Sequence, residues 1–157
     1  MIIFDKPVEG VSHAGLQRFA RRARELAGVK GEIAILITSR RKMQALNLGF
    51  RGKNEATDVL SFPRQQGGDI AICREMARQN AGRLGHSVTE EIKVLVLHGM
   101  LHLAGYDHET DSGQMAAKEA RLRSRLKLPA SLIQRNQPVS AARRSGVETS
   151  ARRGRKR

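Results

Sequence analysis

Three of the five histidines of this 157-residue chain lie within the segment HGMLHLAGYDH, which runs from His98 to His108. Their spacing is H-x-x-x-H-x-x-G-x-x-H, so His98 and His102 stand about one helical turn apart. Side chains four residues apart on a helix share one face, about 6 Å from each other, and both imidazoles can reach one cation. Gly105 can end the helix with a positive φ, and the following turn can return His108 as a third ligand. Three protein ligands with one open position are the arrangement of catalytic zinc.

Ordinary histidines, either buried and hydrogen-bonded or exposed, are the alternative interpretation of this segment. For one isolated histidine the alternative would be the better one. Two histidines inside an otherwise apolar helix each need a partner, because buried polar groups are rarely left unpaired. A third histidine beyond a helix-ending glycine favours a metal site further. His13 and His86 lack such company, and we expect both at the surface. Zinc is the expected ion, one per chain, although imidazole also suits nickel, copper and iron.

The residue after the first histidine separates this segment from the zinc proteases. Those enzymes place a glutamate there as general base, whereas this chain has Gly99. A glycine inside a helix costs about 1 kcal/mol relative to alanine, so it needs a local reason. Either a substrate or another backbone approaches closely at Gly99, or the helix packs tightly there, and the sequence favours neither. The histidine spacing supports a protease, and the glycine opposes it.

A phosphodiester is the other substrate class that such a site could serve. A bound metal can polarise an oxygen and lower the pKa of bound water to about 7. Attack on a phosphodiester adds negative charge, so the site needs a further cation. Arg51, in FRGKNEATDVLSFP, is the candidate catalytic residue, because a guanidinium can bind phosphate through two parallel hydrogen bonds. We expect it in a loop with Lys53, before a strand. Tyr106 and Asp107 could orient a ligand of the metal.

The charge of the chain favours a polyanionic partner. Residues 138–157 hold seven of the 29 basic and one of the 15 acidic residues, so they carry +6 of the net charge of +14 and leave +8 on residues 1–137. A body with this charge most often binds nucleic acid, the alternative being a solvated basic surface. Aromatic residues make up 3% of the chain and Trp is absent. A stacking platform like that of an RRM or OB-fold is therefore not expected.

Other features of the sequence bound the compartment and the cofactors. No stretch approaches 18 consecutive apolar residues, so we expect no membrane span. The N-terminal segment MIIFDKPVEG lacks the marks of a signal peptide. Cys73 is the only cysteine, which excludes an internal disulfide and a cysteine-based zinc cluster. We expect a cytoplasmic protein without a small-molecule cofactor, and the oligomeric state stays open.

Hydrophobic periodicity predicts an α+β fold, in which a small mixed sheet of about four strands packs with helices. Strands are expected at residues 1–5, 31–39, 57–63 and 68–73, and helices at 12–27, 40–50, 74–85, 88–104 and 112–128. The helix at 88–104 is apolar on nearly every side, so it should be the central, buried helix that carries the first two histidines. Ser87 with Glu90 fits a capping box at its start, with Thr89 as the alternative cap.

Beyond residue 128 the periodic pattern fades. We expect a single domain over residues 1–137 and a basic, disordered tail over 138–157, because the tail has too few apolar residues to pack.

Taken together, these motifs resemble the YbeY family of bacterial rRNA maturation endoribonucleases. The likeness rests on HGMLHLAGYDH, on NLGFRGKNEATDVLSFP at 47–63 and on GGDIAIC, and it runs from about residue 2 to 128. The resemblance implies one metal ion, usually taken as zinc, held by His98, His102 and His108, with a functional arginine at Arg51. It also implies cleavage of single-stranded RNA, maturation of the 3′ end of 16S rRNA, and ribosome quality control at the small subunit.

Two other functions stay open beside this leading interpretation of a metal-dependent endoribonuclease. One is a metalloprotease-like hydrolase. The other is a non-catalytic ribosome assembly factor with a structural metal, which the charge fits equally well and the ligand number opposes. The sequence does not identify the general acid or base, nor whether water or the RNA 2′-hydroxyl is the nucleophile.

Removal of residues 138–157 tests the interpretation of the tail. We expect the melting temperature to stay unchanged, because the segment has too little apolar content to pack. RNA binding should weaken and its salt dependence flatten, by up to ~0.7 log unit for each phosphate that the shortened protein no longer neutralises. Thermal unfolding and a salt titration of RNA affinity measure the two effects. A clear drop in melting temperature would show that the tail is docked on the domain.

Overall fold

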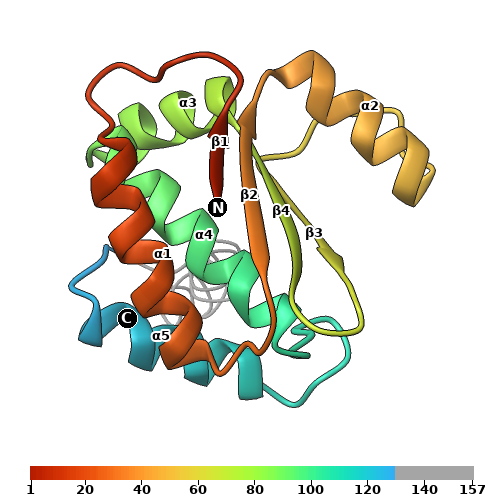
Figure 1. Ribbon diagram of the computed structural model, residues 1–157, viewed down its shortest axis with the longest axis vertical. Coiled ribbons are helices and arrows are strands. Elements are labelled where there is room, and N and C mark those ends of the chain that lie inside the picture. The colour runs from red at the N-terminus through yellow and green to blue at the C-terminus, as the bar shows by residue number, and fades with distance from the viewer. Residues whose placement is uncertain (130–157) are drawn as a thin grey trace, which may run out of the picture.

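The computed structural model describes residues 1–129 and shows an α+β fold (Figure 1). The elements in chain order are β1 (Ile2–Phe4), α1 (His13–Ala27), β2 (Ile33–Thr38), α2 (Arg40–Arg51), β3 (Val59–Pro63), β4 (Gly68–Cys73), α3 (Arg74–Leu84), α4 (Val88–Leu103) and α5 (Gln114–Arg125). The expected fold class is confirmed, and each expected helix and strand is present with its ends within three residues of those expected. The domain boundary expected at 137/138, and the tail beyond it, lie outside the described residues.

The four strands form one mixed sheet in the order β1-β2-β4-β3. β1 and β2, and likewise β2 and β4, pair in parallel, whereas β3 runs antiparallel to β4. The parallel β1–β2 pair needs a crossover connection, which α1 supplies, while a short turn is enough to join β3 to β4. β3 is last in this order and forms an outer edge of the sheet. Segments that pack on the two faces of the sheet can meet around this edge.

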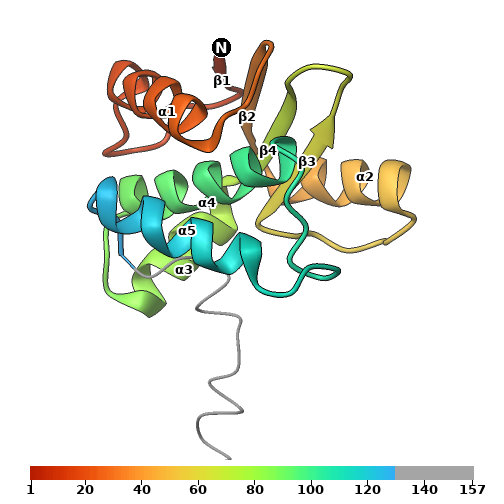
Figure 2. The same ribbon diagram turned by 90° about the horizontal axis from the view of Figure 1, so that it is seen from below.

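Each face of the sheet is covered by different helices, because successive strand residues point to opposite sides. On one side Ile70 and Ile72 of β4 join the main core, to which α1, α4 and α5 contribute. On the other side Leu60 and Ala71 pack with Met43 of α2 in a smaller cluster. Figure 2 shows α2 beyond β3 and β4, away from α4 and α5. The sheet thus separates α2 from the histidine-bearing helix.

α4 lies at the centre of the core, and its side chains are buried almost all round. Its start is the expected capping box: the Ser87 hydroxyl accepts from the Glu90 amide at 3.0 Å, and the Glu90 carboxylate accepts from the Ser87 amide at 3.3 Å. Its end leads into Gly105, whose φ of 100° is the positive value expected there. None of the helices in residues 1–129 is long and apolar enough to cross a membrane.

Gly99 is explained by close packing between α4 and β4. A Cβ atom at this position would lie 2.9 Å from Cδ1 and 3.0 Å from Cγ2 of Ile70, a fully buried residue. On the same side, the Ser61 hydroxyl donates to the Gly99 carbonyl at 3.3 Å. Of the two explanations that the sequence left open, tight packing is therefore the one that the structure supports. A glutamate at this position would have to displace Ile70.

The surface position expected for His86 is wrong. Its side chain is 10% exposed, and its Nε2 lies 2.7 Å from Oε1 of Glu91, whose side chain is completely buried on α4. The buried carboxylate needs a partner, and His86 supplies one from the turn before the helix. His13 is exposed as expected, with Nε2 2.9 Å from the Ile2 carbonyl oxygen.

Alanine substitution at two helical glycines tests the packing of α4. Gly82→Ala on α3, where a Cβ meets nothing within 4 Å, should gain about 1 kcal/mol from helix propensity. Gly99→Ala should end about 1–3 kcal/mol less stable than this control, because the added methyl overpacks Ile70. Urea unfolding measures the free energy of unfolding of both variants. Adding Ile70→Val to Gly99→Ala should recover part of the lost stability, because the smaller side chain leaves room for the methyl group. Equal stability of the two alanine variants would contradict the packing argument.

Candidate metal centre

The three histidines of the motif converge at the C-terminal end of α4. His98 and His102 stand on the last turns of the helix, and the turn beyond Gly105 returns His108 beside them. One ring nitrogen from each residue lies within 4.8 Å of the other two. The ring centroids of His102 and His108 are both close to that of His98, at 4.8 and 5.5 Å. His98 is buried, His102 is half-buried and His108 is exposed.

Hydrogen bonds fix which nitrogen of each helical histidine faces the centre. Nδ1 of His98 lies 2.8 Å from a Glu119 carboxylate oxygen, and Nδ1 of His102 lies 3.0 Å from the Tyr106 carbonyl oxygen. Both partners accept hydrogen bonds, so the network assigns the proton of each ring to Nδ1. Each Nε2 then carries a lone pair, as a metal ligand must.

The two Nε2 atoms lie 3.1 Å apart. Two lone pairs that face each other at this distance repel unless a proton or a cation lies between them. Two nitrogens bound to a tetrahedral zinc, with bonds of about 2.0–2.1 Å, would be separated by about 3.3 Å. The three imidazoles therefore fit a zinc-like ion in chemistry, and the His98–His102 pair fits it in spacing as well.

The protonation state of His102 agrees with this role. Burial lowers the pKa of His102 below its ordinary value, and the nearby His98 and His108 lower it further. The hydrogen bond to Tyr106 raises the pKa, but it does not outweigh the other causes. A depressed pKa keeps the imidazole neutral at physiological pH, which is the form that binds metal.

Glu119 is a residue of the centre that the sequence analysis missed. It lies on α5, is 1% exposed, and orients the His98 ring through the 2.8 Å contact. Carboxylates behind metal-binding histidines fix the ring and raise its basicity. The spacing of Met115, Glu119 and Leu122 places them on one face of α5, and all three are buried. A carboxylate on an otherwise apolar helix face needs a buried partner, so this pattern could have indicated the role of Glu119.

The turn that carries His108 is shaped by Asp107. Its side-chain Oδ1 accepts from the Glu109 amide at 3.0 Å, and its carbonyl accepts from the Asp111 amide at 3.0 Å. Tyr106 acts through its backbone carbonyl, which orients His102. Both residues therefore support ligands, although Tyr106 does so through an atom that sequence cannot single out.

Arg51 lines the same cleft as the three histidines. The cleft has a volume of about 780 Å³ and follows β3, and its walls include the end of α2, the end of α4 and the turn beyond it. The expectation of a loop position for Arg51 is wrong, because Arg51 is the last residue of α2, with Gly52 as the cap at a φ of 69°. Its side chain is exposed. The end of α2 thus brings one guanidinium to the cavity that the three imidazoles also line.

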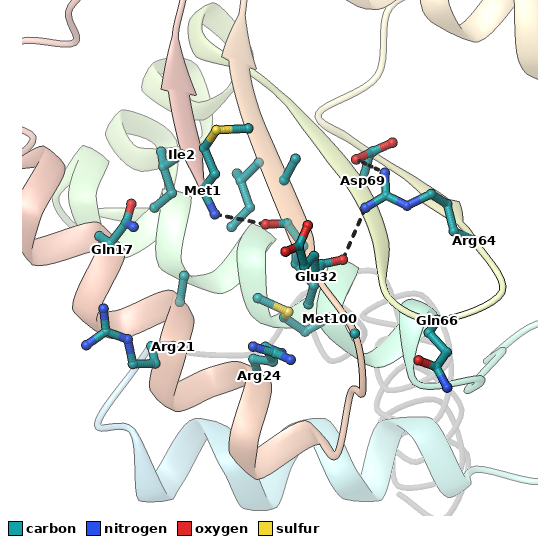
Figure 3. A pocket seen from close by; sticks show the side chains of 15 residues that line it. Met1, Ile2, Gln17, Arg21, Arg24, Glu32, Arg64, Gln66, Asp69 and Met100 are labelled. Atoms are coloured by element: carbon teal, nitrogen blue, oxygen red, sulfur yellow. Dashed lines mark hydrogen bonds and ion pairs between the residues drawn. The ribbon is translucent and has the colours of Figure 1, made fainter.

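A larger hollow, of about 1030 Å³, lies between α1 and β2 (Figure 3). Arg21 and Arg24 of α1 stand on one wall, and on the other Arg64 forms an ion pair with Asp69 at 2.7 Å. Within residues 1–129 the histidine trio is the one group of three or more potential metal ligands, and it does not border this hollow. The candidate metal ligands therefore belong to the smaller cleft.

Comparison with known proteins agrees with this geometry. The family model described as Endoribonuclease YbeY matches residues 6–127, which is most of the chain. The chain belongs to the YbeY family. An Endoribonuclease YbeY of Koribacter versatilis is 52% identical over 138 residues, covering 86% of this chain and 91% of the relative. The Endoribonuclease YbeY of Nautilia profundicola is 48% identical over 111 residues, covering 68% and 80%.

A solved structure is also similar to this YbeY chain. The solution structure of TM1509 from Thermotoga maritima superposes with a TM-score of 0.56 at 28% identity, and it covers 80% of this chain and 89% of that one. The family resemblance indicated by the motifs is thus confirmed, together with the fold.

Glutamine substitution at two buried glutamates tests the support of the metal centre. Glu119→Gln should weaken metal binding by about 10- to 100-fold, because the His98 ring loses its anionic acceptor. Glu91→Gln is the matched control, since Glu91 is equally buried and also contacts a histidine, but that histidine is His86. Competition with a metal indicator gives the affinities. Equal losses in both variants would mean that Glu119 acts only through stability.

Proposed function

We propose that this YbeY chain is a metal-dependent endoribonuclease that cuts single-stranded RNA and matures the 3′ end of 16S rRNA in the bacterial cytoplasm, with a part in ribosome quality control. The observation that carries the proposal is one cleft that is lined both by three histidines with converging ring nitrogens and by an exposed arginine. The relatives whose names describe an endoribonuclease support RNA as the substrate. The net charge of +14 is suited to a polyanion.

The proposed metal ligands are His98, His102 and His108. A divalent ion, zinc by preference, would supply Lewis acidity and an acidified water when bound there. The protein's part is to hold two rings rigidly, through the Glu119 carboxylate and the Tyr106 carbonyl, with the Nε2 atoms turned inward. The third ring, on the turn, is the exposed one and borders the open cleft.

Arg51 is the proposed catalytic cation. Its side chain is exposed at the end of α2 and borders the cleft, so a substrate phosphate can approach the guanidinium from solvent. Two parallel hydrogen bonds to non-bridging phosphoryl oxygens would bind the substrate and share the charge that develops during attack. This role needs a cation that borders the same cavity as the imidazoles, and the presence of Arg51 in the lining of the cleft supports it.

The metalloprotease alternative is weakened by the packing at Gly99. A zinc protease needs a carboxylate beside the first histidine, and here a side chain at that position would run into Ile70. The alternative of a structural metal is weakened by the ligand count, because structural zinc sites are closed by four protein ligands. Within the described residues the cluster has three.

One set of assays separates these functions. The purified full chain, loaded with zinc, is incubated with single-stranded RNA, with a 16S rRNA precursor and with casein, in the presence and absence of chelator. We expect about one ion per chain by elemental analysis, endonucleolytic RNA cleavage that chelator abolishes, and intact casein. His98→Ala and His102→Ala should lose most of the metal and the cleavage together.

Several results would overturn the proposal. Cleavage that survives in His98→Ala would come from a contaminating nuclease. Proteolysis lost in the same variant would restore the protease alternative. Full metal occupancy without cleavage of any RNA would favour the assembly factor with a structural metal.

Arg51→Lys tests the role of the guanidinium. Cleavage should fall by about 10-fold or more while the metal content and melting temperature stay unchanged, because a point charge cannot replace the two-pronged contact. Arg41→Lys is the control, since Arg41 is exposed on the same helix but does not line the cleft. Single-turnover cleavage rates give the comparison. If both lysine variants cleave at the wild-type rate, Arg51 is a solvated surface residue.

A further inference from the structure

The few aromatic side chains of this protein gather around the metal-site cleft. The chain has four Phe, one Tyr and no Trp. Phe50, Phe62 and Tyr106 are three of these five, and all three line the cleft together with Arg51 and the histidines. The low aromatic content argues against a stacking platform like that of an RRM or OB-fold. The three aromatic residues that line the proposed RNA site can still provide a single stacking contact.

Phe50 is the exposed member of this group. It is 70% exposed, which is unusual for a large apolar side chain, whereas Phe62 and Tyr106 are half-buried. Its ring lies against that of Phe62, with centroids 4.8 Å apart and planes at 52°. Phe62 in turn packs on the small core cluster of Met43 and Leu60. The Phe50 ring is therefore braced from behind while much of its surface stays open to solvent.

The neighbours of Phe50 indicate what would cover it. Arg51 follows directly in sequence at the end of α2, so an exposed apolar ring and an exposed cation both border the cleft. A nucleotide has the same pair of features, a flat base and an anionic phosphate. Single-stranded nucleic acid is bound elsewhere by this combination of stacking and positive charge, and the net charge of +14 suits such a polyanion.

We propose that Phe50 is a substrate-positioning residue on which one unpaired base of the RNA stacks, next to the phosphate held by Arg51. The inference rests on the proposed endoribonuclease function and adds the way in which the strand is held. It requires an unpaired base, because both faces of a base inside a duplex are covered by its neighbours. The strand would then cross the edge strand β3 from α2 toward the end of α4, since the cleft follows that path.

Abasic RNA tests the stacking contact directly. Fluorescein-labelled single-stranded oligonucleotides, each with one abasic nucleotide at a different position, are titrated with the full chain in chelator, and anisotropy gives Kd without cleavage. For the wild type, one or two abasic positions should weaken binding by about 5- to 100-fold. Phe50→Ala should weaken binding of the intact oligonucleotide by the same factor, with no further loss at those positions. Phe50→Trp should restore the wild-type pattern.

Leu48→Ala is the matched control. Leu48 is also a large apolar residue of α2, 49% exposed, and it does not line the cleft. We expect Leu48→Ala to bind every oligonucleotide as the wild type does, and both alanine variants to keep the wild-type melting temperature. If Phe50→Ala and Leu48→Ala lose RNA affinity equally, the proposal is overturned, because any exposed apolar side chain of α2 would then have the same effect.

The remaining outcomes separate this inference from the proposed function. If the metal-loaded wild type cleaves RNA and Phe50→Ala binds and cleaves RNA equally well, the endoribonuclease stands, the stacking contact is overturned, and the exposed ring faces a protein partner. If Phe50→Ala loses affinity but the loss adds to that of every abasic position, no single base stacks there, and the proposal is overturned as well. If the wild type neither binds nor cleaves single-stranded RNA, the proposed function itself fails.

Discussion

The close approach of α4 to β4 sets where the histidine-bearing helix lies against the sheet. Where Gly99 faces Ile70, the helix lies nearer to the sheet than any side chain larger than hydrogen would allow without a shift of the isoleucine. The same packing turns the remaining surface of α4 into core and leaves its last turn at the end of the sheet, beside β3. His98 and His102 flank this contact on the helix, so the position of these two candidate metal ligands follows from a backbone distance that the missing side chain of Gly99 allows.

Burial of α4 also decides how its polar residues are satisfied. Glu91 and His98 lie in the core, and among the partners of each is a residue from a neighbouring segment, His86 for Glu91 and Glu119 for His98. Both pairs join a carboxylate to an imidazole, but only His98 has its second nitrogen turned toward other histidines. A buried polar group without a partner would cost roughly 1–3 kcal/mol, so both pairs support the stability of the fold. One of them in addition presents a lone pair for chemistry.

The cleft forms where elements from both faces of the sheet meet. α2 packs on one face and α4 on the other, and they come together only around the outer edge strand β3. An edge strand is normally a liability, since its unpaired backbone groups can recruit other chains. Here the edge is flanked by an exposed arginine and by the histidine cluster. Groups that stay separate over most of the sheet thus border one cavity of about 780 Å³.

The helices, the strands and the three-histidine motif could be predicted from the sequence, because hydrophobic periodicity, caps and histidine spacing are local properties. The capping box at Ser87 and the positive φ of Gly105 are such local features. Contacts between side chains of different elements could be seen only in the tertiary structure. Glu119 faces His98 from 21 residues away, and Ile70 explains Gly99 from another element. The cleft that Phe50 shares with the histidines likewise depends on how α2 and α4 pack around β3. No periodicity encodes such distances, since they follow from packing of the whole core.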